Sequence, residues 1–251
     1  MNINSDINFL GGLADWHLVT AFIGNDQKKA SFNPVASADF TVIKTDKSIR
    51  RYAKAIHNTL LHFSNKDMEA LCRQLIRAKG IDSETLLVLF WNTAFNNQLF
   101  HYLNEKVFFP AFYSGRSGIK RDEVVACMDD LKQTQPVLRE WSASTLLTTA
   151  SKYLSLLKKF GLMEGSLTKT ICYPYLSDEM FIIFIYWLVA ASSMPNLLKS
   201  EWLVYGFTEI QPFIDRLMQK KYAIFFHITY TGNRLEIETQ INYQNLYETL
   251  Q

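Results

Sequence analysis

The sequence contains few of the residues that stabilise small secreted or metal-bound domains. Its three cysteines, Cys72, Cys127 and Cys172, are odd in number, lie far apart and form no C-x-x-C pair. Such a set argues against a disulfide framework and against a structural zinc site. We therefore expect reduced thiols and a cytoplasmic protein.

The sequence also lacks a secretory start and a long hydrophobic run. No basic residue precedes Lys28, so the charged region that begins a secretory signal is missing. The strongest apolar run, Met180 to Ala191, has twelve residues, whereas a membrane-spanning helix needs about 20. This run predicts a buried helix, and we expect a soluble protein without a membrane partner.

Sequence motifs of the common enzyme classes are missing as well. There is no G-x-x-x-x-G-K-[ST], no G-x-G-x-x-G and no H-E-x-x-H. The five histidines are scattered, and His57 and His62 lie five residues apart, so one helix would point them in different directions. We predict a non-enzymatic protein with no catalytic residues, no metal, no cofactor and no small-molecule substrate.

Charge is nearly balanced over the whole chain. The 26 Lys and Arg residues face 24 Asp and Glu residues, which leaves a formal net charge of +2 over 251 residues. A surface that binds a polyanion must therefore be local. With 48% hydrophobic residues, the chain can bury an ordinary core in one large domain or in two small ones.

Helical periodicity dominates the first part of the sequence. Apolar residues at spacings of three and four predict helices over residues 47–63 and 67–79, with Asp46 or Ser48 as the first cap and Gly80 as the stop. A long apolar helix is expected from Asp82 to Leu103. We expect these helices to form an N-terminal bundle over residues 1–112.

A break at Pro110 and over residues 113–118 precedes the second expected domain, residues 113–251. Gly115 to Gly118 fits the G-x-x-G loop of KH domains, but the surrounding strands are missing, and a flexible connector is the preferred interpretation. A short helix over 122–131, a second apolar patch over 137–141 and a third helix over 142–160 precede a hairpin near 162–175. Three helices followed by a hairpin have the order of a winged helix-turn-helix. A helix near 208–220 and a hairpin near 222–240 complete a mainly α fold of two packed bundles.

One short segment is strongly basic. Between Thr41 and Lys54 five cations stand against Asp46 alone. Helical phase places most of them opposite the apolar stripe, where they could meet successive phosphates of a nucleic acid. An ordinary solvated helix face explains the same pattern about equally well. The candidate nucleic-acid contacts here are Lys44, Lys47, Arg50, Arg51 and Lys54.

The expected third helix of the winged module is the second candidate surface. No acidic residue occurs between Trp141 and Met163, and one helix edge combines hydroxyls with lysines. That edge lacks the Arg, Asn and Gln side chains that make bidentate base contacts, so readout of backbone and shape is favoured. Its members are Thr145, Thr148, Lys152, Ser155 and Lys159, and Arg116, Lys120 and Arg121 extend the basic surface.

These stretches resemble the BrxA family, accessory proteins of the BREX bacteriophage-defence systems. The similarity lies in KSIRRYAKAIHNTLLHF from Lys47, in the apolar helix after Asp82, and in WSASTLL from Trp141 with KKFGLMEG from Lys158. It implies a mostly helical, non-enzymatic protein that binds double-stranded DNA. The family has also been likened to the RNA-binding protein NusB, and some members were labelled inner-membrane proteins. RNA binding, or a role as a protein-protein adaptor with other BREX proteins, therefore remains an alternative.

Overall fold

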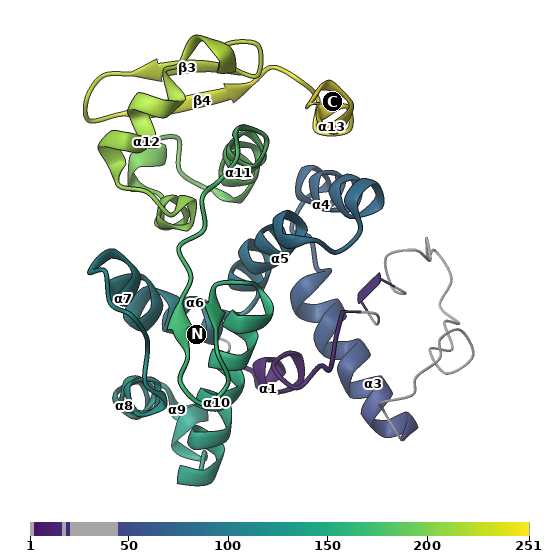
Figure 1. Ribbon diagram of the computed structural model, residues 1–251, viewed down its shortest axis with the longest axis vertical. Coiled ribbons are helices and arrows are strands. Elements are labelled where there is room, and N and C mark those ends of the chain that lie inside the picture. The colour runs from purple at the N-terminus through teal and green to yellow at the C-terminus, as the bar shows by residue number, and fades with distance from the viewer. Residues whose placement is uncertain (1–2, 17–18, 21–44, 251) are drawn as a thin grey trace. The chain divides into compact units, whose positions relative to one another are not determined.

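The computed structural model describes residues 3–16, 19–20 and 45–250. The described chain is mainly helical, as the sequence predicts, with a small antiparallel hairpin in its last part (Figure 1). It forms two compact units. The first comprises Met1–His62 and Gly80–Tyr173, and the second comprises Phe63–Lys79 and Pro174–Gln251.

The first unit holds both candidate surfaces. Its elements are α1 (Asp6–Leu10), α3 (Asp46–Ala55), the π-helix η1 (Ile56–Leu60), α5 (Ser83–Asn96), α6 (Gln98–Leu103), the π-helix η2 (Asn104–Phe108), α7 (Phe109–Tyr113), α8 (Arg121–Lys132), α9 (Pro136–Arg139), α10 (Ala143–Lys159), β1 (Met163–Glu164) and β2 (Thr170–Ile171). The elements of the second unit are α4 (Lys66–Lys79), α11 (Asp178–Ala191), the 3-10 helices η3 (Leu197–Lys199), η4 (Glu201–Gly206) and η5 (Lys220–Tyr222), α12 (Ile210–Leu217), β3 (Phe226–Tyr230), β4 (Leu235–Thr239) and α13 (Leu246–Leu250).

These units differ from the expected division at residue 113. The helix α8 packs against η2, which precedes that position, so residues 80–173 fall in one unit. The helix α4 belongs to the second unit, where Lys79 pairs with Glu179 at 2.8 Å and the Asn65 amide donates to the Ala190 carbonyl. Whether residues 1–112 and 113–251 fold as separate domains stays a prediction.

Two helix starts in the first unit differ from the expected ones. The cap of α3 is Thr45, whose hydroxyl accepts from the Ser48 N–H at 3.3 Å, rather than Asp46 or Ser48. The expected single helix from Asp82 to Leu103 is interrupted at Asn97, an extended residue whose side chain caps α6 by accepting from the Phe100 N–H. Both are short polar side chains of the kind that satisfies free N–H groups at a helix start.

Buried aromatic rings fix the orientation of α10. Phe100 lies with its ring centroid 5.6 Å from that of Tyr153 and 6.0 Å from that of Phe160. The Tyr153 hydroxyl donates to the side-chain oxygen of Asn104 at 2.9 Å. A buried tyrosine that satisfies its hydroxyl has little freedom to rotate, so these contacts determine which face of α10 remains at the surface.

In the second unit the strongest apolar run forms the buried helix α11, as predicted. Its residues from Met180 to Leu188 are each at most 4% exposed, and the Ser177 side chain caps its start. The expected C-terminal hairpin is present, with Phe226 opposite Thr239 and Tyr230 opposite Leu235. Within the described ranges, no helix is both long enough and apolar enough to span a bilayer.

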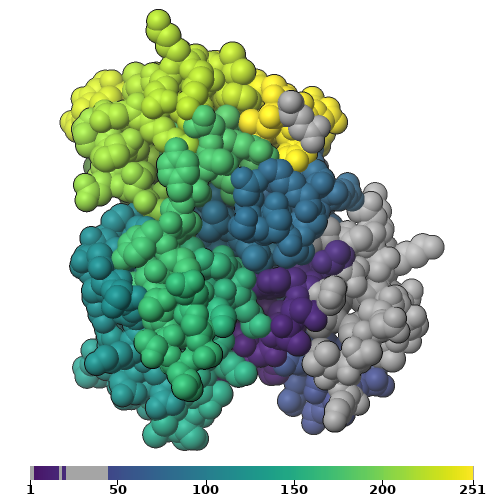
Figure 2. Space-filling model, viewed as in Figure 1, coloured from purple at the N-terminus to yellow at the C-terminus, as the bar shows by residue number. Residues whose placement is uncertain are grey.

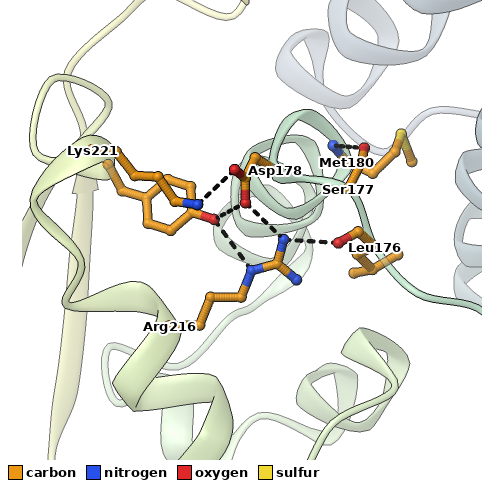
Figure 3. Close-up of polar contacts among 7 residues, drawn as sticks. Leu176, Ser177, Asp178, Met180, Arg216 and Lys221 are labelled. Carbon is orange, nitrogen blue, oxygen red and sulfur yellow. Dashed lines mark hydrogen bonds and ion pairs between the residues drawn. The ribbon is translucent and has the colours of Figure 1, made fainter.

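A cluster of charged side chains ties the start of α11 to α12 and η5 (Figure 3). The Asp178 carboxylate accepts from the Lys221 ammonium at 2.6 Å, from the Tyr222 hydroxyl at 2.6 Å and from the Arg216 guanidinium at 3.1 Å. Arg216 also donates to the Leu176 carbonyl at 2.7 Å. The hydrogen bonds from Lys221 and Tyr222, with Arg216 beside them, hold the pKa of Asp178 at about 2.

The Asp178→Asn variant should therefore be less stable than the wild type at neutral pH. The expected loss is about 1 kcal/mol at most, because the pairs are half exposed to solvent and screened. The folded pKa is below the ordinary 3.8, so the contribution is present above pH 4 and is lost as the pH falls towards 2. Denaturant titrations should show the difference shrinking over that interval, while Asp215→Asn, a control on α12, should match the wild type throughout.

Candidate nucleic-acid interface

The basic segment forms an exposed ridge on α3. The basic ridge consists of Lys47, Arg50, Arg51 and Lys54, all exposed, while Ile49 on the opposite side of the helix is buried. The ridge residues, together with Asp46, line a shallow hollow of about 490 Å³. Lys44, the fifth predicted contact, lies outside the described residues.

The cations of the basic ridge have no ion-pair partner among the described residues. Among the residues that the structure describes, no carboxylate forms an ion pair with Lys47, Arg50, Arg51 or Lys54. Lys54 acts at longer range on Asp6, where burial raises the carboxyl pKa and the lysine lowers it by a smaller amount. Four cations spaced along about two turns of helix match a ligand with repeated negative charges.

The exposed face of α10 differs in part from the predicted edge. Thr148 is exposed and Ser155 is half-buried, but Lys152 and Lys159 lie on the flank of the helix, half-buried. The hydroxyl of Thr145 is engaged with that of Ser142 at 3.0 Å, at the start of the helix. We name the side of α10 opposite its buried stripe the hydroxyl face; its members are the exposed Ser144, Leu147, Thr148 and Lys158 and the half-buried Ser151 and Ser155.

The helix α1 covers the flank of α10 that carries the two lysines. A Cβ placed on Gly11 would lie 2.2 Å from the Lys152 carbonyl oxygen, which shows how closely the two backbones approach. Trp16 stacks on Phe160 with ring centroids 5.5 Å apart. Burial lowers the pKa of Lys159, and the charge of Lys152 lowers it further. Because α1 contacts both α3 and α10, it joins the two candidate surfaces.

The three basic residues before the winged module differ in whether an acidic side chain neutralises them. Arg116 forms an ion pair with Glu123 at 2.7 Å, and this pairing lowers the pKa of Glu123. The Arg121 guanidinium forms a longer ion pair with the Asp122 carboxylate, with Nε and Oδ1 3.7 Å apart. Lys120 is the exposed cap residue just before α8, and its backbone N–H donates to the Glu123 carboxylate. Of the three, Lys120 therefore has its charge most available for a ligand.

The segment expected to be a connector is bridged at its end to the strand β2. Gly118 forms an antiparallel bridge with Thr170 of β2, and the Ile171 N–H donates to the Ser117 carbonyl at 2.8 Å. On its other side β2 pairs with β1, where Met163 lies opposite Ile171. The helix α8 packs against α10, which leads directly into this hairpin. Figure 2 shows α10 and the hairpin, in teal and green, at the surface of the molecule.

Sequence reasoning missed Lys158 and the hairpin tip. Lys158 is exposed and its ammonium donates to the Gly165 carbonyl at 2.7 Å. The apolar stripe that contains Tyr153 and Leu157 was a usable signal, because the direction opposite to it passes through Ser151, Ser155 and Lys158. The fully exposed Leu167 of the tip had no such signal.

Comparison with known proteins identifies one family. The sequence profile of the BrxA family matches residues 26–185, which is more than half of the chain. This span includes the basic ridge, the hydroxyl face and the hairpin. No curated protein and no solved structure gives a significant match.

Proposed function

We propose that this chain, which belongs to the BrxA family of BREX-associated phage-defence proteins, binds double-stranded DNA as a non-enzymatic, cytoplasmic accessory protein. The observation that carries the proposal is the basic ridge, four exposed cations without ion pairs among the described residues of a nearly neutral protein. Neutralised phosphates release counterions, and this supplies binding that does not depend on sequence.

The order of elements in the first unit supports a winged helix-turn-helix. An extended segment at Ser117–Gly118 is followed by α8, α10 and the hairpin of β1 and β2, and the extended segment lies beside β2. In such a module α10 would be the recognition helix and the hairpin would be the wing. The hydroxyl face of α10 would then approach the groove, with Lys158 and Lys120 near phosphates.

The chemistry of the hydroxyl face favours readout of backbone and shape. Three of its members are serines, one is Thr148, and none is Arg, Asn or Gln. The Ser151 and Ser155 hydroxyls already donate to the carbonyls of Leu147 and Ser151, and the Ser144 hydroxyl is bonded to that of Ser142. These short side chains therefore offer a duplex close approach of the helix more than free donors, which positions a protein on DNA and discriminates weakly between sequences. We expect modest sequence preference and a strong dependence of affinity on salt.

Fluorescence anisotropy of a labelled duplex, titrated at two salt concentrations, tests the proposal. Binding should weaken steeply as salt rises, and unlabelled DNA duplex should compete better than RNA duplex of the same sequence. Better competition by RNA would assign the site to RNA. Absence of salt-dependent binding to either would remove nucleic acid as the ligand.

The second unit offers a reason to keep an adaptor function as the alternative. Several of its apolar side chains are open to solvent, including Ile210 at 53%, Met218 at 55% and Ile224 at 63% exposed. Docking sites join such residues into a patch, and Ile210 and Met218 stand at the two ends of α12. Co-purification with other BREX proteins through this unit, together with failure of the DNA titration, would favour the adaptor.

Replacing Thr148 with alanine should alter sequence preference without altering salt dependence. Thr148 is exposed on the hydroxyl face, and neither the wild-type nor the variant side chain carries charge. Thr145→Ala is the matched control, because the Thr145 hydroxyl is already engaged with Ser142. Affinities for a panel of duplexes should change rank for the first variant only. An identical effect of both substitutions would show that α10 does not read DNA through Thr148.

A further inference from the structure

The tip of the hairpin displays one apolar side chain entirely to solvent. Leu167 is 101% exposed, whereas Leu162 and Met163 at the base of the same hairpin are 0% and 2% exposed. A leucine in this state gains nothing from the hydrophobic effect in the free protein. A single exposed leucine is ordinary at a protein surface, so the loop that holds Leu167 and the cations beside it must distinguish this one.

The loop that carries Leu167 is held in shape. Gly165 has a φ of +88°, and a Cβ on it would lie 2.1 Å from the Thr168 carbonyl oxygen, so the turn is tightly wound. Two lysines fasten the loop: the ammonium of Lys158 donates to the Gly165 carbonyl at 2.7 Å, and that of Lys169 donates to the Ser166 carbonyl at 3.1 Å. Because the loop is already ordered, it loses little conformational entropy when Leu167 contacts a ligand.

The surroundings of Leu167 match DNA better than a protein surface. Protein docking sites join several apolar residues into a patch, but the neighbours of Leu167 at the tip are Ser166, Thr168 and Lys169. Proteins that kink DNA insert a lone apolar side chain between base pairs from the minor groove, with cations beside it. The carboxylate of the hairpin, Glu164, lies below the tip on β1 and accepts from the Thr170 hydroxyl.

We propose that Leu167 enters the minor groove of the bound duplex and wedges between two adjacent base pairs, while Lys158 and Lys169 lie near the flanking phosphates. This inference rests on the proposed DNA binding. A wedge of this kind would favour DNA sites that contain a pyrimidine-purine step, because such steps unstack more easily than others. The hairpin would thus deform the duplex, whereas the hydroxyl face of α10 only lies against it.

The test uses the full chain and duplexes that carry 2-aminopurine, whose fluorescence rises when it unstacks. The wild type should raise the fluorescence at one step of the site and bend the duplex, as measured by energy transfer between its ends. Leu167→Ala should abolish both signals and weaken binding about tenfold, with an unchanged salt slope. Because the side chain is fully exposed, the melting temperature of the protein should not change.

Two variants separate the wedge from a general loss of binding. Leu167→Met keeps a long apolar side chain and should retain both signals. Lys169→Ala should lower the magnitude of the salt slope by about 0.9 and retain the unstacking signal, because Lys158 still holds the Gly165 carbonyl and the tight turn at Gly165 is unchanged. If the wild type binds DNA with steep salt dependence but Leu167→Ala gives wild-type fluorescence and bending, the wedge is wrong and the proposed function stands. If the wild type does not bind DNA, both are wrong.

Discussion

Replacing Arg50, Arg51 and Lys54 together with alanine should weaken binding to duplex DNA about a hundredfold at about 0.15 M salt. Each cation that neutralises one phosphate contributes about 0.9 to the slope of log affinity against log salt, so the triple variant should lose about 2.7 from the magnitude of that slope. The loss should be similar for all duplex sequences, because phosphates carry no sequence information.

The triple variant should remain folded, since all three side chains are exposed and the buried side of α3 is formed by Ile49 and Ala55. A matched control removes three exposed lysines of the second unit, Lys66, Lys199 and Lys220, and so lowers the net charge equally. Anisotropy titrations at four salt concentrations should show a reduced slope for the ridge variant and a nearly wild-type slope for the control. Equal slopes for both variants would mean that net charge, rather than the basic ridge, governs binding.

The basic ridge could be predicted from sequence because helical phase alone determines its position. Arg50 and Lys54 are four residues apart, and Ile49 marks the buried side of the same helix. The π-helical turn that continues α3 could not be predicted in this way. Its freed carbonyl groups at Thr59 and Leu60 accept from Asn96 and Asn92 of α5, a pairing across more than 30 residues of sequence.

The edge of α10 shows a second limit of sequence reasoning. Its buried stripe, its cap Ser142 and its end at Gly161, with a φ of +76°, follow the predicted pattern. The phase of α10 alone predicts Lys152 and Lys159 on the open surface, and both are half-buried. Nothing in the sequence of α10 indicates what covers its flank. The covering element, α1, has only five residues, too few to show a helical period.

The division into units was also determined by distant contacts. The helix α4 has the buried residues that its periodicity predicts, yet its Lys79 pairs with Glu179 and lies over the ring of Tyr247, both in the second unit. Asn65, just before α4, donates to the Ala190 carbonyl of the same unit. The segments before and after α4 belong to the first unit, and nothing in their sequence indicates that α4 packs in the second unit. A local pattern predicts which face of a helix is buried, but the surface that covers this face depends on the whole chain.

Substituting Gly11 with alanine should destabilise the first unit by about 1–3 kcal/mol, the usual cost of overpacking a tight contact. The backbone of Gly11, with φ −66° and ψ −14°, suits alanine as well as glycine, so conformational strain is not the reason. The added Cβ would lie 2.2 Å from the oxygen and 2.8 Å from the carbon of the Lys152 carbonyl. Backbone atoms of a packed helix cannot rotate aside, so α1 must retreat from α10.

This retreat should have consequences for both stability and DNA binding. Ile7 and Leu10 of α1 are fully buried, and both lose contacts when α1 moves. The same movement should alter the placement of α10 relative to the basic ridge, because α1 contacts α3 as well as α10. Urea denaturation measures the first effect, and anisotropy titration under conditions where the variant remains folded measures the second.

The neighbouring Gly12→Ala variant is the matched control. Its added Cβ would lie 3.1 Å from the Tyr52 hydroxyl oxygen, which is the end of a side chain and can move, and 3.2 Å from the carbonyl oxygens of Asn8 and Phe9, which need give by only a few tenths of an ångström. Gly12→Ala should therefore cost less than about 1 kcal/mol. A Gly11→Ala protein that keeps wild-type stability would show that α1 is not held tightly against α10 in solution. Lys152 and Lys159, which are half-buried beside α1, would then be fully open to DNA, as the sequence alone predicts.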